Sequence, residues 1–377
     1  MQMRLCRLGS EVPMDLNEPK VTKLRLLFSA NKTDVTEDLS KDLLSWSYSD
    51  KETGQADEIS LTLQDKTGKW ASTWKPDGGE VIRAYLSSGT ASSRGAELYC
   101  GSFYVDTVRF SGSPKTVEIR AVSIPLSKPI RRLKRTRAWE SKDLKSIASG
   151  ICSDAGMSLV FDSSLNPTFD RVDQNKEADL SFINRLCEDS GLSLKVTDNQ
   201  MVIFDQEAYE SKDPVATFVL GESNILRYDF ETAQSESYKS VTVKWRDTNR
   251  KTKDTAASFS WDLKDPATKK TNPAVMSFTY TDPNASDSDQ EYYMKRRATS
   301  QSEAKRLAKA KLRSLNSHRM TGSMTVVGDP MLSAGTVIAC EGIGAFDGNF
   351  IVEEANHSYS SSGYTTDLRL RRVNNDY

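Results

Sequence analysis

Alternating apolar and polar residues dominate the first third of the chain, and a two-residue period of this kind predicts β-strands. The clearest case is residues 58–65, EISLTLQD, in which alternate side chains are apolar. Residues 80–88, 102–110 and 115–124 show similar runs, and the turn sequence SGSPK joins the last two as a hairpin. We therefore expect residues 20–125 to form a β-domain.

The apolar period lengthens to that of a helix after about residue 140. Ser141 stands where a helix N-cap is expected, and Gly156 stands at the position after the helix end. Apolar residues recur between them at helical spacing, at Leu144, Ile147, Ala148, Ile151, Cys152 and Ala155. A second helical run precedes Gly191, and residues 193–204 have the pattern of a hairpin. These elements predict a small α/β module over residues 140–212.

A basic segment, residues 126–139, joins these two regions. Its cationic residues are Arg131, Arg132, Lys134, Arg135 and Arg137. Prolines at positions 125 and 129 oppose a continuous helix here. We interpret the segment as a solvated linker, and the alternative is a contact with an acidic partner or with nucleic acid.

The last region, residues 213–377, returns to alternating patterns and predicts a second β-domain. Residues 246–299 are poor in apolar side chains, so we expect long polar loops in this stretch. A helix is predicted over residues 300–317, because Ser300 and Glu303 match a capping box. The chain is thus β-rich, then α/β, then β-rich. This order suggests two related barrels, although no repeat of fixed period is visible.

The helix over residues 300–317 carries the clearest candidate interface. Its apolar face contains Ala304, Leu307, Ala308 and Leu315. Its opposite face is basic and contains Lys305, Arg306, Lys309 and Arg313. The alternative is the ordinary solvent face of an amphipathic helix.

Composition excludes several classes of protein. The 51 basic and 52 acidic residues nearly cancel, which gives no support for a dedicated nucleic-acid binder. No run of 18 apolar residues occurs, so no membrane span is expected. The N-terminus lacks the apolar core of a secretory signal, so we expect synthesis in the cytoplasm without a signal peptide.

Candidate chemistry is sparse. The cysteines are scattered and are expected to be buried free thiols rather than zinc ligands: Cys6, Cys100, Cys152, Cys187 and Cys340. Glu353 and Glu354 are neighbours on a predicted strand, so they point to opposite faces and cannot act as a paired acid and base. His357 lies nearby without an evident orienting partner. We therefore predict no catalytic, cofactor-binding or metal-binding residue.

Three sequence patterns follow one another in a fixed order. The first consists of ADEISLTLQD, residues 56–65, and WKPDGGEVIRAYL, residues 74–86. The second is a helical motif carried by Gln174, Glu177, Asp179, Leu180, Phe182, Arg185, Leu186, Glu188 and Gly191. The third runs through TGSMTVVGDPMLSAGTVI, residues 321–338, and GIGAFDGNFIVEEANHSYSSSGYTTDLRLRR, residues 342–372. Together they resemble the late-control protein D hubs of contractile-tailed phages, which are related to the hub portion of VgrG proteins of type VI secretion.

The resemblance implies a mainly β fold with an α+β insertion. Two tube-type β-barrel domains would flank the small α/β module and follow an N-terminal extension, residues 1–19. Three chains would then assemble as a trimeric ring of pseudo-sixfold symmetry. Such a ring adapts a six-fold tail tube to a three-fold central spike without any catalytic step.

The resemblance also implies partners and a location. The expected partners are a homotrimer, the tail tube protein and a separately encoded central spike. Wedge and LysM-type baseplate proteins and the C-terminus of a tape-measure protein are further candidates. No small-molecule substrate is expected, and DNA would be met only if it passes through the lumen. The expected location is the baseplate of a virion or a phage-tail-like injection particle.

Two other functions stay open. A tail-associated lytic enzyme would depend on residues such as Glu354 or His357. A tail-tip carbohydrate-binding adhesin would use Trp70, Trp74 and Trp139 to line a sugar site.

Overall fold

The chain is mainly β, as predicted, with a smaller share of helix. The computed structural model divides it into two compact units. Unit 1 contains residues 1–188, 192–232 and 320–373, and unit 2 contains residues 189–191, 233–319 and 374–377. The structure describes residues 20–373 except 31–32, 91–96, 125–128, 132, 198–199, 234–236, 247–274, 284, 287–288, 295–297 and 299. The predicted N-terminal extension, residues 1–19, and most of the predicted polar loops therefore lie outside the described residues.

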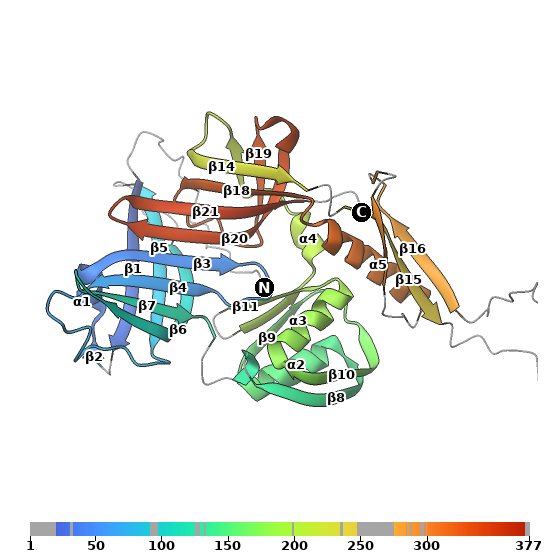
Figure 1. Ribbon diagram of the computed structural model, residues 1–377, viewed down its shortest axis with the longest axis horizontal. Helices are drawn as coiled ribbons and strands as arrows, with labels where there is room; N and C mark the ends of the chain where they lie inside the picture. The colour runs from blue at the N-terminus through green and yellow to red at the C-terminus, as the bar shows by residue number, and fades with distance from the viewer. Residues whose placement is uncertain are drawn as a thin grey trace, which may run out of the picture. The chain divides into compact units, whose positions relative to one another are not determined.

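The first β module of unit 1 is an antiparallel sheet with the strand order β1-β5-β6-β7-β4-β3 (Figure 1). Its strands are β1 (Lys20–Ala30), β3 (Leu43–Lys51), β4 (Glu58–Gln64), β5 (Val81–Thr90), β6 (Glu97–Ser111) and β7 (Thr116–Val122). The short strand β2 (Thr33–Asp34) and helix α1 (Thr36–Asp42) connect β1 to β3. The predicted alternation on β4 is confirmed, because Ile59, Leu61 and Leu63 are all fully buried in the module's core.

The second β module of unit 1 has the strand order β13-β19-β20-β21-β18-β14. Its strands are β13 (Ala216–Val219), β14 (Ile225–Thr232), β18 (Met320–Val327), β19 (Val337–Glu341), β20 (Gly348–Ser360) and β21 (Gly363–Arg372). The 3-10 turn η3 (Gly344–Phe346) lies between β19 and β20. Buried residues of these strands, among them Met324, Phe350 and Leu368, form a separate core.

The two β modules share one topology. When the six strands of each module are numbered separately in chain order, without the short strand β2, the spatial order is 1-4-5-6-3-2 in both. Strand β5 thus corresponds to β19, β6 to β20, β7 to β21, β4 to β18 and β3 to β14. All neighbouring pairs among these strands are antiparallel in both modules. Only the outermost pair differs, because β1 is antiparallel to β5 whereas β13 is parallel to β19.

Register and bulges reveal a sequence repeat within this shared topology. The β6–β7 ladder shifts between Val105 and Thr107, and the β20–β21 ladder shifts at the corresponding place, between Val352 and Glu354. Aligning the two bulges superimposes GSFYVDTVRFS, residues 101–111, on GNFIVEEANHS, residues 348–358. The leading glycines adopt nearly the same backbone angle, with φ of 135° and 131°. The two modules are therefore related at the level of individual residues.

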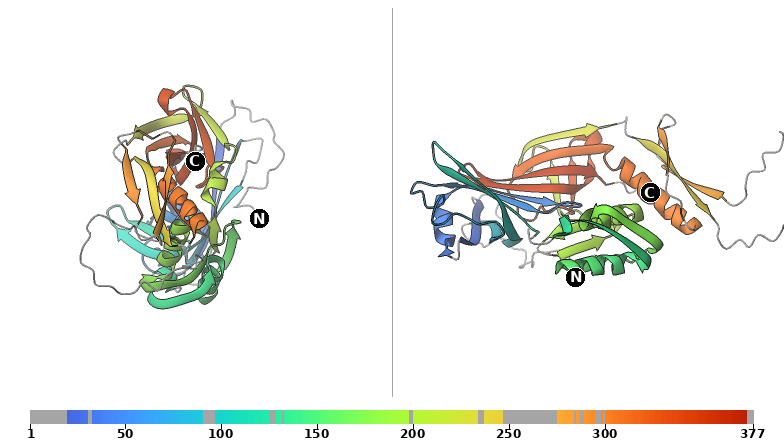
Figure 2. Two further views of the ribbon diagram at one scale, coloured as in Figure 1. Left: turned by 90° about the vertical axis from the view of Figure 1, so that its right-hand side faces the viewer. Right: turned by 60° about the horizontal axis from the view of Figure 1, so that its bottom comes forward.

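The modules are joined edge to edge into one sheet. Strand β3 pairs antiparallel with the second half of β20, from Lys51 opposite Glu354 to Ser45 opposite Ser360 (Figure 2). The path through this sheet ends at β14 on one side and at β2 on the other. The predicted pair of barrels is thus not present as closed barrels among the described strands. Each set of strands continues into the other instead.

The α/β module follows the first β module and has its own core. Its elements are η1 (Pro129–Arg131), β8 (Lys134–Asp143), α2 (Leu144–Ala155), β9 (Ser158–Asp162), β10 (Thr168–Ala178), α3 (Asp179–Ser190), β11 (Ser193–Thr197), β12 (Gln200–Phe204) and α4 (Gln206–Glu210). The predicted apolar face of α2 is buried, and Gly156 ends this helix in the left-handed conformation. The predicted N-cap was wrong, because the side chain of Asp143, not that of Ser141, accepts the hydrogen bond from Ser146 N.

The predicted linker, residues 126–139, is only partly a connector. Its second half belongs to β8, which pairs antiparallel with β10 from Lys134 opposite Ala178 to Asp143 opposite Thr168. The basic residues of β8 suggested a solvated linker, so the strand was not predicted. In the structure Arg137 of this strand is paired with Asp154 and Asp179. Solvation alone therefore does not account for this charge run.

Unit 2 is inserted between β14 and β18. Its sheet has the order β16-β15-β17, and helix α5 (Gln301–Asn316) packs against it through Ala304, Leu307, Ala308 and Leu312. The strands are β15 (Tyr238–Arg246), β16 (Val275–Thr281) and β17 (Gln290–Tyr293). The chain therefore divides differently from the predicted ranges. Part of the predicted loop region 246–299 is strand, and residues 213–377 do not form a single domain.

Candidate functional site

The predicted basic patch lies on α5 of unit 2. Ser300 is confirmed as the N-cap of this helix, since Glu303 N donates to Ser300 Oγ over 3.2 Å. Lys305 is exposed, whereas Arg306, Lys309 and Arg313 are half-buried. The buried face also includes Leu312, which the periodicity analysis missed, while Leu315 is only partly buried. The helix is amphipathic as expected, and an interface on its basic face stays a prediction.

The carboxylates considered for acid–base chemistry are committed to separate ion pairs. Glu353 Oε1 lies 3.3 Å from Arg371 Nε, and Glu354 Oε1 accepts a hydrogen bond from Ser49 Oγ over 2.7 Å. The two side chains thus face different neighbours, as expected for adjacent residues of a strand. They do not form a pair that could divide acid and base roles between them.

His357 is a core residue. Its ring is fully buried, stacks on Tyr48 at 5.8 Å between centroids, and shares a 2.7 Å hydrogen bond between Nδ1 and Tyr364 Oη. Burial lowers the pKa of His357 to about 4, so the ring is neutral at pH 7. A buried neutral imidazole of this kind supports packing between β20 and β3 rather than proton transfer to a substrate.

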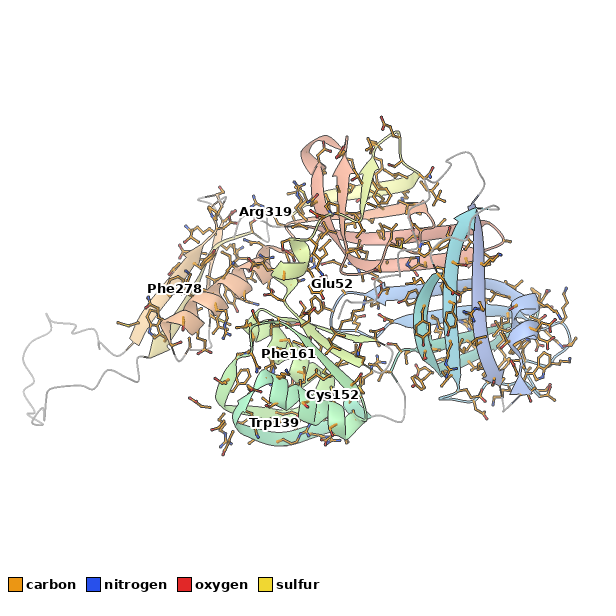
Figure 3. All side chains as sticks on the ribbon, turned by 180° about the vertical axis from the view of Figure 1, so that it is seen from behind. Glu52, Trp139, Cys152, Phe161, Phe278 and Arg319 are labelled. Carbon is orange, nitrogen blue, oxygen red and sulfur yellow. The ribbon has the colours of Figure 1, made fainter. Side chains whose placement is uncertain are left out.

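The tryptophans proposed for a sugar site belong to two different cores. Trp70 is fully buried, and its Nε1 donates to Asp42 Oδ2 over 2.8 Å, while Trp74 packs edge-on against it. Trp139, labelled in Figure 3, stacks on Phe182 in the α/β module. These three rings do not line one surface, and packing explains their positions.

A buried ionic cluster joins the second β module to the α/β module, and sequence reasoning missed it. Arg371 of β21 contacts three carboxylates through different nitrogens: Glu210 at 2.7 Å, Glu52 at 3.3 Å and Glu353 at 3.3 Å. The side chains of Arg371, Glu52 and Glu210 are each only 5% exposed. Burial raises the pKa of Glu52, and the charge of Arg371 opposes that rise. Glu52 is labelled in Figure 3.

A second buried cluster ties the first β module to the α/β module. Lys195 Nζ of β11 lies 2.5 Å from Asp50 Oδ1 of β3, and Ala334 N donates to the other oxygen of Asp50 over 2.9 Å. Burial raises the pKa of the neighbouring Asp57 to about 7, although Lys195 acts in the opposite direction. The backbone joins the same parts, since Gly54 N donates to Leu194 O over 2.9 Å.

The helical motif of the α/β module is structural. Gln174 Nε2 donates to Asp179 Oδ1 over 2.8 Å, and Arg137 of β8 also binds Asp179. Arg185 pairs with Glu177 at 2.9 Å. The polar residues of the motif thus bind helix α3 to the β8–β10 ribbon.

Metal sites, cysteines and membrane-spanning helices were also considered in the described part of the chain. No group of three or more His, Cys, Asp or Glu side chains there could hold a metal ion. Cys100, Cys152, Cys187 and Cys340 are buried free thiols, as predicted, while Cys6 lies outside the described residues. Within the same limits, the structure contains no helix with the length and apolar character needed to span a bilayer.

Comparison with known proteins identifies the family. A family model described as phage tail baseplate hub (GPD) matches residues 119–363. The chain belongs to this family. It is also 25% identical over 367 residues to a probable baseplate hub protein of Escherichia phage 186, covering 91% of this chain and 92% of that protein.

Solved structures support the same fold. A tail protein from Neisseria meningitidis MC58 matches with a TM-score of 0.66 at 14% identity, covering 93% of this chain and 96% of that one. The E. coli c3393 protein, a component of the type VI secretion system, matches with a TM-score of 0.54 at 14% identity, covering 89% and 75% of the two chains. The baseplate hub has a structural role in the phage tail, in agreement with the family resemblance found in the sequence.

Proposed function

We propose that three copies of this baseplate hub form a ring that adapts a six-fold tail tube to a three-fold central spike. The observation that carries the proposal is the repeated topology and register of the two β modules within one chain. Three chains with two related modules each provide six similar units. A ring of such units can match a six-fold partner on one face and a three-fold partner on the other.

The side chains that sequence analysis considered for catalysis have structural contacts instead. Glu353 and Glu354 are held in ion pairs with Arg371 and Arg369, and His357 is buried. We propose that the protein acts through binding alone. Its partners are the tube protein, a central spike and other baseplate proteins, in the baseplate of a virion or a tail-like particle.

The mass of the purified protein in solution tests the proposal. We expect light scattering to give three times the 42.0 kDa chain mass, either for the protein alone or after co-expression with its spike protein. Electron microscopy of the same sample should show a ring with six lobes of similar size. A mass of one chain in every condition, with the spike protein present, would contradict the proposed ring.

A further inference from the structure

The junction between the two β modules within one chain provides a pattern for a contact between chains. Strand β3 of the first module pairs with the second half of β20 of the second module. Tyr48 lies opposite His357 in this register, and Ser49 lies opposite Asn356. Aromatic side chains on both strands are buried, since Trp46 is 1% and His357 is 0% exposed.

Each strand of this junction has an equivalent in the other module. The bulge between Leu43 and Ser45 on β3 corresponds to the bulge between Ile225 and Arg227 on β14. This aligns LLSWSYSD, residues 43–50, with ILRYDFET, residues 225–232. The second half of β20 corresponds in the same way to residues 107–111 of β6.

Both equivalent edges lack a strand partner on the corresponding side, as far as the described strands show. Strand β14 pairs only with β18 and ends the path of the sheet. Residues 107–111 pair only with β7, because β5 leaves β6 at Tyr104. Unpaired edges of this kind expose backbone donors and acceptors that a second chain can satisfy.

Aromatic side chains on the two unpaired edges are more exposed than their equivalents on the paired strands β3 and β20. Tyr228 on β14, the equivalent of Trp46, is 43% exposed, and Phe110 on β6, the equivalent of His357, is 42% exposed. The positions of Trp46 and His357, which are buried within the chain, are thus exposed at the two free edges, whereas Phe230, the equivalent of Tyr48, is half-buried. Aromatic side chains left exposed at a sheet edge are typical of a surface that becomes buried on assembly.

We infer that β14 of one copy pairs antiparallel with residues 107–111 of β6 in the next copy, repeating the junction between β3 and β20. This inference rests on the proposed ring and specifies the contact that builds it. Transfer of the register places Phe230 opposite Phe110 and Glu231 opposite Arg109. The aromatic pair takes the place of Tyr48 and His357, and opposite charges face one another at the next position.

A second copy of this chain fits the two edges better than a different protein does. The two edges have complementary side chains and lie on different parts of the same polypeptide, so each copy offers both halves of the contact. Such a head-to-tail contact closes into a ring when its rotation divides the circle. The junction within the chain already joins one module to its relative in this manner.

Disulfide cross-linking tests the register directly. The variant Arg109→Cys/Glu231→Cys places two cysteines opposite one another, where strand partners come close enough for a disulfide. The matched control, Arg109→Cys/Asp229→Cys, moves one cysteine two residues along the same face, to a diagonal position beyond the usual disulfide distance. All three substituted residues are exposed, so the fold should be retained, and unchanged melting of each single variant checks this. The wild-type protein measures any cross-linking by native cysteines.

The assembled protein, co-expressed with its spike protein, is oxidised and separated without reductant. We expect most chains of the first variant to run as covalent dimers and trimers, and the control pair to remain near the wild-type background. A trimeric mass without these bands, or with equal bands for the control pair, would overturn the register while leaving the proposed ring intact. A single-chain mass in all conditions would overturn both.

A charge reversal provides an independent check of the same contact. Arg109→Glu and Glu231→Arg each place like charges opposite one another, so each should lower the fraction of trimer at a given protein concentration. The double variant restores opposite charges and should recover the trimer. Failure of the double variant to exceed both single variants would count against the predicted pair.

Discussion

Replacement of Arg371 by methionine tests whether the buried ionic cluster holds the second β module to the α/β module. The change keeps much of the side-chain volume and removes the cation that three carboxylates share. Each guanidinium contact goes to a different acid, at 2.7 Å for Glu210 and 3.3 Å for both Glu52 and Glu353. Without Arg371, charged carboxylates remain in a site where Glu52 and Glu210 are only 5% exposed.

Arg371→Met should lower the free energy of unfolding strongly. Removal of one partner from a buried ion pair lowers the free energy of unfolding by about 3–5 kcal/mol. At roughly 2–4 °C per kcal/mol for a structure of this size, the melting temperature of unit 1 should fall by roughly 10 °C. Arg371→Lys should recover only part of this loss, because one ammonium group cannot contact all three carboxylates in the same way.

The neighbouring residue Arg369 offers a matched control on the same strand. Its side chain is 73% exposed and lies 3.7 Å from Glu354, so Arg369→Met should change stability by only about 0–1 kcal/mol. Calorimetry or urea unfolding monitored by tryptophan fluorescence measures both variants. The deficit of Arg371→Met should also be smaller at pH 5 than at pH 8, because burial raises the pKa of Glu52 and protonation of this carboxyl removes buried negative charge. An effect no larger than that of Arg369→Met, or one independent of pH, would refute this reasoning.

Two further predictions concern buried titratable groups. The pKa of Asp57 is raised to about 7 in the folded protein, so its contribution to stability is fully present below the ordinary pKa of 3.8 and is lost as the pH rises through about 7. Asp57→Asn stays neutral, and its stability relative to wild type should therefore increase between pH 5 and pH 8 in urea titrations; a constant difference would contradict the shift. Burial raises the pKa of the Cys152 thiol to about 11, and that of Cys340 to about 12. Neither thiol should react with Ellman's reagent at pH 8 until the protein unfolds, and rapid labelling of either in the native protein, located by mass spectrometry, would be the contrary result.

Local patterns predicted the elements that depend on neighbouring residues. The apolar spacing before Gly156 indicated α2, and Ser300 with Glu303 indicated the start of α5. Caps and helical periodicity act within a few residues, so one stretch of sequence contains the whole signal. The same analysis placed the cap of α2 at Ser141 rather than Asp143, because both residue types can accept the capping hydrogen bond.

Contacts between distant segments were not visible in the sequence. The β8 strand was interpreted as a linker because its arginines suggested solvent, whereas Arg137 pairs with Asp179 from a helix 42 residues away. The ionic cluster on Arg371 brings together Glu52 and a strand more than 300 residues later. The spacing of residues within one stretch of sequence does not indicate such pairings, since each joins segments that are far apart in the chain.

The sequence by itself determined the β-rich, α/β, β-rich order of the chain, the helices with clear caps, and the family to which it belongs. The same order suggested that the two β regions are related, but only the tertiary structure decided which of their strands correspond and that β3 and β20 join the modules into one sheet. The repeat was hidden because unit 2 interrupts the second module between β14 and β18, whereas a short loop joins the equivalent strands β3 and β4. Strand pairing tolerates such insertions, because it depends on the alignment of backbone hydrogen bonds across the sheet and not on distance along the chain.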